Sequence, residues 1–275
     1  MLKLRWLLLP LIFGCLPTAA EVELHLTGQW VQGGLILGKT LPGTRVVLDG
    51  TPVRVSDQGD FLLGFGRDHP QKSQLELSYQ NGIKELRQLE IKKREYQIQR
   101  IDGLPKRKVA PEPIDYDRIR RDSAAARQAR SRDDPRTDFI SGWMWPVKGP
   151  ISGVYGSQRV LNGEPRRPHY GVDIAVPVGT PVKAPADGIV TLAHPDMFFS
   201  GATLIIDHGH RLSSSFLHLD KILVKSGDRV RKGDIIAEVG KSGRVTGAHL
   251  DWRMNLANAR IDPQLLVEPM PGMSK

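Results

Sequence analysis

The sequence predicts an all-β protein in which two β-rich units are joined by one helix. Residues 21–100 contain short alternating segments bounded by turn residues, a pattern typical of β-strands. Residues 143–268 repeat that pattern, with glycine turns between strand-like segments and almost no helical periodicity. We therefore divide the chain into a leader at 1–20, a first β unit, a connecting segment at 101–142, a second β unit and a tail at 269–275.

The leader has the composition of a secretory signal peptide. Lys3 and Arg5 precede an apolar run at 6–13, and small residues then lead to Ala20. We expect cleavage after Ala20 and secretion across the inner membrane into the periplasm. Lipidation at Cys15 is the alternative, because the residues before it loosely resemble a lipoprotein cleavage box.

Length, cysteine content and charge limit the function further. At 275 residues the chain is long enough for one or two domains with buried cores. Its apolar runs are shorter than the ~20 residues of a membrane-spanning helix, so we expect no transmembrane segment in the mature chain. Cys15 is the single cysteine, and its removal with the leader would exclude disulfides and thiol catalysis. The net charge of +9 favours an anionic polymer such as cell wall over nucleic acid as a partner, with a merely solvated basic surface as the alternative.

The first β unit is predicted to be a small β-sandwich. Asp49 and Gly50 form a hairpin-turn signal between the apolar segments 45–48 and 53–55. Residues 74–79 alternate as a half-buried strand does. The unit contains no constellation of catalytic residue types, and we interpret its histidine at position 25 as structural.

The connecting segment begins as a basic linker and continues as a helix. Residues 115–132 lack glycine and proline and are rich in alanine and arginine, which predicts a solvent-exposed helix. Its apolar stripe is thin, because Ile114, Tyr116 and Ile119 lead it and mostly alanines continue it. We expect a solvated connection, with a basic face that contacts the cell envelope as the alternative.

The second β unit is predicted to be an antiparallel barrel or sandwich, and it holds six of the eight histidines. Its expected strands are 180–183, 188–192, 203–207, 213–217 and 235–239.

Three segments of this unit carry candidate site residues. His169 and Asp173 are four residues apart with a glycine between them, so a bend would let both reach one zinc ion, although a simple hydrogen-bonded pair has the same spacing. His218 lies among apolar residues, where a buried structural histidine is the ordinary interpretation. His249 and Asp251 project from the same face of an expected strand, where they would place a ligand beside a proton-transfer group.

Taken together, these segments resemble peptidase family M23, the zinc endopeptidases of the lysostaphin type. The resemblance runs from Trp145 to Val267, nearly half of the chain. It rests on ordered matches at 169–175, 179–182, 184–190, 206–209, 216–219, 227–230, 232–234 and 243–250.

The resemblance implies a duplicated-hybrid-motif-like fold, one Zn²⁺ per chain and hydrolysis of peptide crosslinks or stem peptides of peptidoglycan by a metal-activated water. It implies that His169 and Asp173 are metal ligands. It also implies that His218 and His249 flank the open metal position, where an imidazole can move a proton and stabilise the oxyanion.

One position departs from the family pattern. The family's last ligand is the second histidine of an HxH motif, and this chain has Asp251 there. A carboxylate binds zinc at about the same distance as imidazole, so we expect a His-Asp-Asp site that is also more open to harder ions such as manganese. The alternative is a site without metal in a catalytically inactive protein that binds cell wall or activates amidases.

The remaining signals are weaker. We interpret His208 as structural or supporting, and His194 and His210 as loop histidines. Residues 226–237 resemble the turn and strand of lipoyl and biotinyl carriers, but no lysine stands at a hairpin tip, so we discard a carrier function. The segments before residue 143 could position the enzyme on the wall, cover its groove, or dock a regulatory cell-wall enzyme.

Overall fold

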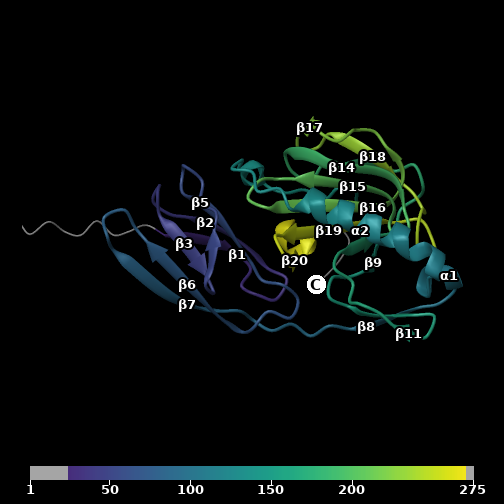
Figure 1. Ribbon diagram of the computed structural model, residues 1–275, viewed down its shortest axis with the longest axis horizontal. Coiled ribbons are helices and arrows are strands. Elements are labelled where there is room, and N and C mark those ends of the chain that lie inside the picture. Colours follow the sequence, from purple (N-terminus) through teal and green to yellow (C-terminus); the bar gives the residue numbers. More distant parts are fainter. Residues whose placement is uncertain (1–23, 271–275) are drawn as a thin grey trace, which may run out of the picture.

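The computed structural model describes residues 24–270, so the predicted signal peptide, Cys15 and the last five residues lie outside the described part. The described chain is mostly antiparallel strands, and Figure 1 shows two β units side by side with helix α2 (Tyr116–Arg130) over the larger one. The predicted all-β fold class with one connecting helix is confirmed. No helix among the described residues has the length and apolar character needed to cross a membrane.

The first unit consists of two antiparallel sheets packed around their own core. One sheet has the order β1-β2-β5 and the other β4-β3-β6-β7. Phe61, Phe65 and Leu75, which are fully buried, lie in the core between them. The strands are β1 (His25–Gly28), β2 (Leu35–Lys39), β3 (Arg45–Leu48), β4 (Thr51–Val53), β5 (Asp60–Gly64), β6 (Lys72–Ser78) and β7 (Lys84–Glu90).

The second unit is built on a ten-stranded sheet whose main path runs β17-β14-β15-β16-β19-β12-β9. A second apolar cluster that includes Trp252, Phe216 and Leu204 forms its core. All five expected strands are present, four of them within longer or equal elements and 180–183 as the slightly shorter β13. The strands are β9 (Ile151–Gly153), β12 (Val172–Ile174), β13 (Pro181–Lys183), β14 (Gly188–Met197), β15 (Gly201–Asp207), β16 (Leu212–Ile222), β17 (Arg229–Val230), β18 (Ile235–Val239), β19 (Leu250–Leu256) and β20 (Ala259–Ile261).

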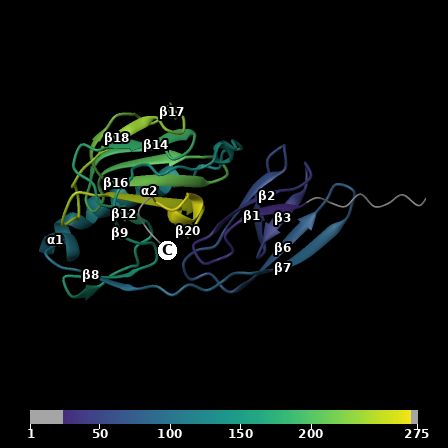
Figure 2. The ribbon, with the colours of Figure 1, turned by 180° about the vertical axis from the view of Figure 1, so that it is seen from behind.

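The connecting segment does not run free between the two units. Strand β8 (Ile98–Ile101) pairs in parallel with β10 (Gln158–Leu161), which forms a hairpin with β11 (Glu164–Pro165). The short helix α1 (Lys106–Val109) follows, and α2 then returns across the sheet. Figures 1 and 2 both show this path: the chain leaves β7, runs along the larger unit to β8, turns at α1 and comes back as α2.

Helix α2 is therefore only partly solvated. It contacts β14 and β15, and Ala129 is buried on its inner face. Ile114 and Tyr116, which were expected to begin the apolar stripe, are 78% and 47% exposed. The inner face combines the small residues Ala126 and Ala129 with the longer Ile119 and Arg130, so it has no continuous apolar stripe.

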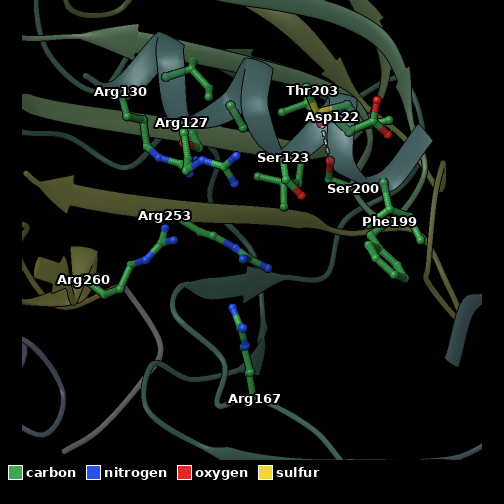
Figure 3. Close-up of a pocket in the computed structure, with 16 residues that line it drawn as sticks. Asp122, Ser123, Arg127, Arg130, Arg167, Phe199, Ser200, Thr203, Arg253 and Arg260 are labelled. Carbon is green, nitrogen blue, oxygen red and sulfur yellow. Dashed lines mark hydrogen bonds between the residues drawn. The ribbon is translucent and has the colours of Figure 1, made fainter. Parts of the chain in front are cut away.

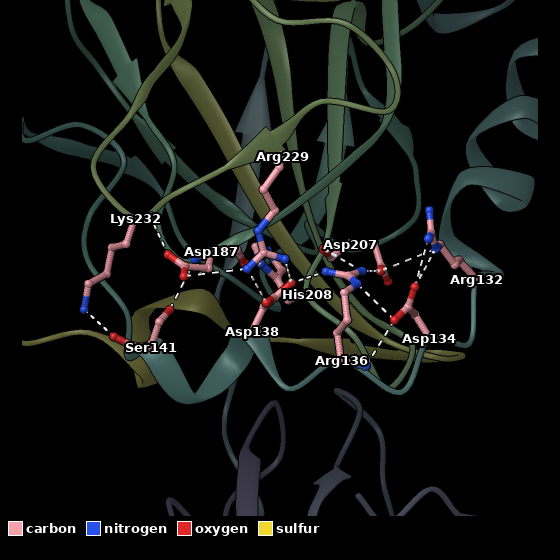
Figure 4. A network of polar contacts seen from close by, with 10 residues as sticks. All are labelled: Arg132, Asp134, Arg136, Asp138, Ser141, Asp187, Asp207, His208, Arg229 and Lys232. Carbon is pink, nitrogen blue, oxygen red and sulfur yellow. Dashed lines mark hydrogen bonds and ion pairs between the residues drawn. The ribbon is translucent and has the colours of Figure 1, made fainter.

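A network of ion pairs fixes the chain that follows α2. Arg136 bonds to Asp134, Asp138 and Asp207, and Arg229 bonds to Asp138 with distances of 2.7 and 2.6 Å. Figure 4 shows how these contacts attach the short 3₁₀ helix Asp138–Ser141 to the end of the larger sheet.

Candidate metal centre

Strand pairing places two carboxylates side by side. Asp173 of β12 is the register partner of Asp251 of β19, and both side chains are buried. Leu217 of β16 is the next partner across the sheet from Asp251. Because directly opposite residues project from the same face, Asp173 and Asp251 share one face of the sheet.

His169 completes a cluster of three possible ligands. One ligand atom from each of His169, Asp173 and Asp251 lies within 4.8 Å of the others. The structure thus brings together the three residues that the sequence predicts as metal ligands, while their ligand role remains a prediction.

Three polar atoms of this cluster, both ring nitrogens of His169 and Oδ1 of Asp173, lack hydrogen-bond partners. His169 Nε2 lies 3.0 Å from Asp173 Oδ1, yet neither atom makes an aligned hydrogen bond, and both are buried. A buried polar group without a partner costs free energy, so such atoms ordinarily have a ligand. Imidazole nitrogen and carboxylate oxygens are zinc ligands, so these residues fit a zinc ion.

Two glycines leave room for the carboxylates. A Cβ atom on Gly153 would lie 2.3 Å from Asp173 Oδ2, and one on Gly171 would lie 2.6 Å from Asp251 Oδ1. Any side chain at either position would therefore displace a candidate ligand.

Two arginines offset the negative charge of the cluster. Arg159 donates to Asp173 Oδ2, and Arg253 Nε donates to Asp251 Oδ1 at 2.9 Å while its Nη2 donates to Oδ2 at 2.5 Å. Burial by itself would raise the pKa of Asp251, but Arg253 and His169 outweigh it and hold that pKa below its ordinary value. Both carboxylates are therefore ionised, which is the form that binds a metal.

Neither arginine was predicted from the sequence as a partner of the cluster. Arg253 stands two residues after Asp251 on the same strand, and that spacing was a usable signal for a partner on the same face. Arg159 carried no such signal, because the contact depends on how β10 lies beside β12.

His218 is held in an unusual backbone conformation beside the cluster. Its φ is 65°, a left-handed value that is uncommon for a residue with a side chain and is often found at functional sites. Its Nδ1 lies 2.8 Å from the carbonyl oxygen of Ser242, so that nitrogen carries the proton and Nε2 is left as an acceptor. Burial lowers the pKa of His218 to about 4, with the charge of Asp251 opposing that shift, so the imidazole is neutral at pH 7.

His249 has the same arrangement. Its Nδ1 lies 3.0 Å from the carbonyl oxygen of Gly247, and its Nε2 lies 3.9 Å from Asp173 Oδ1. The rings of His218 and His249 are 4.9 Å apart. The two histidines predicted to act on the metal-bound water thus lie together, and Nε2 of His218 is unprotonated.

The connecting segment forms part of the wall around this site. A cavity of about 160 Å³ is lined by Asp173, His218 and His249 on the sheet side. Gln99, Ile101 and Leu104, which precede α1, line the same cavity. The connecting segment thus runs over the candidate metal centre.

The other histidines of the second unit are not part of the cluster. Both ring nitrogens of His208 have partners, the carbonyl of Asp187 at 2.6 Å and the hydroxyl of Ser214 at 2.7 Å, which supports a structural role. His210 packs against Phe139, and His194 accepts a backbone N–H from Asp196.

Comparison with known proteins matches the second unit to a family. A sequence model described as Peptidase family M23 matches residues 167–263. The chain is 36% identical over 149 residues to peptidoglycan DD-endopeptidase ShyB of Vibrio cholerae, and 41% identical over 104 residues to ShyA of that organism. These matches cover 54% and 34% of this chain but only 32% and 24% of the relatives, so the chain spans a third or less of their length.

A solved structure covers nearly the whole described chain. A Pseudomonas aeruginosa protein whose crystal structure was assigned to peptidase M23 is 32% identical, with a TM-score of 0.67. The match covers 86% of this chain and 95% of that one, so the similarity includes the first β unit and the connecting segment as well as the metal centre.

Proposed function

Because the chain belongs to peptidase family M23, we propose that it is a zinc metallo-endopeptidase that hydrolyses peptide crosslinks or stem peptides of peptidoglycan. The observation that carries this proposal is the buried group of His169, Asp173 and Asp251, in which two facing polar atoms have no hydrogen-bond partner. Three protein ligands with a fourth position left for water are the arrangement of catalytic zinc sites.

Each step of hydrolysis has a group suited to it. When bound, a zinc ion would lower the pKa of its water to about 7 and so supply a nucleophile at neutral pH. Nε2 of His218 or His249 would accept the proton of the attacking water as its oxygen adds to the peptide carbonyl carbon. The protonated imidazole then stabilises the oxyanion or gives the proton to the leaving amine as the C–N bond breaks.

One observation favours a second candidate function. Arg253 engages both oxygens of Asp251, and an ion pair of that kind could take the place of metal coordination. The protein would then bind cell wall or activate an amidase without cutting peptides itself. The two functions differ in whether zinc is bound and in whether peptide bonds are cut.

Secretion into the periplasm belongs to the same proposal. It is supported by the signal-peptide pattern of the N-terminal residues and by the net charge of +9, which suits an anionic wall.

The deciding experiment measures metal content and digestion of purified peptidoglycan by the same protein preparation. We expect about one zinc per chain and the loss of crosslinked fragments, and we expect a zinc chelator to abolish that loss. His218→Asn, which tolerates the left-handed backbone, should keep its zinc and lower the rate about 10²- to 10⁴-fold. Absence of bound metal and of digestion, with wall binding intact, would establish the second candidate instead.

A further inference from the structure

A second cavity, of about 350 Å³, lies between α2 and the larger sheet. Five arginines from four separate parts of the fold line it, and Figure 3 shows their side chains pointing toward one another across the open space. They are Arg127 and Arg130 of α2, Arg167 before β12, Arg253 of β19 and Arg260 of β20.

These positive charges are almost entirely without counterions. Within residues 24–270, Arg253 is the single member with a carboxylate partner, and Arg260 bonds to the neutral side chain of Asn255 at 3.0 Å. The acidic residue that lines the cavity, Asp122, instead accepts the backbone N–H of Phe198 at 2.6 Å. Within the described chain, four of the five arginines therefore have no carboxylate partner that offsets their mutual repulsion.

The repulsion acts on their pKa values. Burial, together with the charges of Arg130 and Arg253, lowers the pKa of Arg260 to about 10. Burial, Arg253 and Arg127 act in the same direction on the pKa of Arg130. Arg130, Arg253 and Arg260 are half-buried while Arg127 and Arg167 are exposed, and crowding charges of one sign disfavours the folded state unless an anion occupies the space between them.

The arginine cavity adjoins the candidate metal centre. Asp251 and Arg253 are two residues apart on β19, so both project from the same face. Arg253 lines the cavity while its guanidinium holds the Asp251 carboxylate. A peptide lying across this face of the sheet could therefore reach the metal centre with one part and the arginines with another.

We propose that this cavity is a subsite that binds a free carboxylate of the peptide substrate beside the bond that is cut. Guanidinium groups bind carboxylates through paired hydrogen bonds, and several of them around one space select for charge. The identity of the ligand as a peptide rests on the proposed function, whereas the preference for an anion rests on the arginines alone.

The test compares a synthetic stem peptide with free carboxylates and the same peptide with its carboxylates amidated. Binding is measured by calorimetry on chelator-treated protein, so that a metal ion plays no part. The unmodified protein should bind the free form about tenfold or more tightly than the amidated form, as expected for charged hydrogen bonds. Arg130→Gln should lose most of that preference.

Arg121→Gln is the matched control, because Arg121 lies on the same helix, is exposed and does not line the cavity. It should keep the full preference. Arg130→Gln should also unfold at the same or a higher temperature than the unmodified protein, because it removes repulsion, whereas a merely structural arginine would lower that temperature. Equal binding of the two peptides by the unmodified protein, or an unchanged preference in Arg130→Gln, would overturn the proposal.

Hydrolysis by the zinc-loaded protein separates this inference from the proposed function. If the peptides are cut but amidation changes kcat/KM by less than twofold, the subsite is wrong and the peptidase function stands. If neither peptide is cut but the carboxylate preference persists in binding, the anion subsite stands and the peptidase function fails.

Discussion

Asp251 has two kinds of partner, the other two candidate metal ligands and an arginine, so a substitution at this position affects both. Its side chain is fully buried, lies within ligand distance of His169 and Asp173, and is held by Arg253. A histidine at this position, as in the family motif, would leave Arg253 without its carboxylate. The aspartate and the arginine therefore act as one unit.

We predict that Asp251 and Arg253 are energetically coupled. In the presence of chelator, Asp251→Asn should lower the free energy of unfolding by about 2–3 kcal/mol, less than for a fully buried pair because 26% of the Arg253 side chain is exposed. Arg253→Met should cost a similar amount, because it leaves two carboxylates facing each other. Urea unfolding of the double variant should show a loss at least about 1 kcal/mol smaller than the sum. Additive losses would mean that the two side chains do not stabilise each other.

Among single residues, those that belong to a sequence motif could be predicted as site residues. Spacing made His169 with Asp173, and His249 with Asp251, separate candidates, and the resemblance to family M23 implied the cluster of His169, Asp173 and Asp251 that the structure brings together. The five arginines around the second cavity were not predicted as a group. They come from α2, a loop and two strands, and only the folded chain brings such distant positions together.

Among the elements, strand β9 leaves room for the metal centre, because its residue opposite Asp173 is a glycine. Gly153 of β9 is the register partner of Asp173, and its lack of a Cβ leaves space for Oδ2. We predict that Gly153→Ala lowers zinc affinity about 10- to 100-fold, the range seen when ligand orientation is disturbed. Gly247→Ala is the control, since a Cβ there would meet nothing within 4 Å. Competition with a chelating dye measures the zinc affinity of both variants. Equal zinc affinities for Gly153→Ala and Gly247→Ala would show that β9 does not constrain Asp173.

The loop that joins β15 to β16 holds a buried histidine that should make stability depend on pH. Burial lowers the pKa of His208 from 6.5 to about 4, while its bond to the Asp187 carbonyl and the charge of Asp138 only partly oppose this. The unfolded chain therefore takes up the proton more readily. The contribution of neutral His208 to stability is complete above about pH 6.5 and is lost as the pH falls toward 4, by about 3 kcal/mol in total.

Replacing that histidine should remove this part of the pH dependence. His208→Gln should be less stable than the unmodified protein at pH 7, but its free energy of unfolding should fall less between pH 7 and 4.5. Urea unfolding at a series of pH values measures this. If the free energy of unfolding falls with pH equally in His208→Gln and in the unmodified protein, His208 is not the source of the pH dependence.

Element prediction succeeded where periodicity was local. The long strands β14, β15 and β16 were indicated by alternation and by glycine turns. Strands β8 and β10 were missed because they are short and pair in parallel over a long separation in sequence, a contact that no local pattern encodes. The helix was located well, but its inner face was not, since small residues pack against a sheet without an obvious apolar stripe.

On the scale of the whole molecule, the connecting segment joins the first unit to the second by passing over the metal centre. Two hydrogen bonds hold it there at Leu104: its N–H donates to Asn162 Oδ1 at 3.1 Å, and Asn162 Nδ2 donates to its carbonyl at 2.7 Å. Leu104 in turn lines the cavity that contains His218 and His249. A peptide substrate that enters this cavity competes with the segment for the same space.

Loosening this contact should therefore raise activity. Asn162 lies at φ 49° in the turn between β10 and β11, so Asn162→Gly removes the side chain without straining the backbone. The loss of two hydrogen bonds worth about 1 kcal/mol each should increase the population in which the segment is open by up to about 30-fold, and the initial rate on peptidoglycan should rise with it. Asn81→Gly is the control, because Asn81 also precedes a glycine in a hairpin turn but lies in the first unit. If both variants digest the wall at the rate of the unmodified protein, the segment does not limit access, and substrate must reach the metal centre from the side of the arginine cavity.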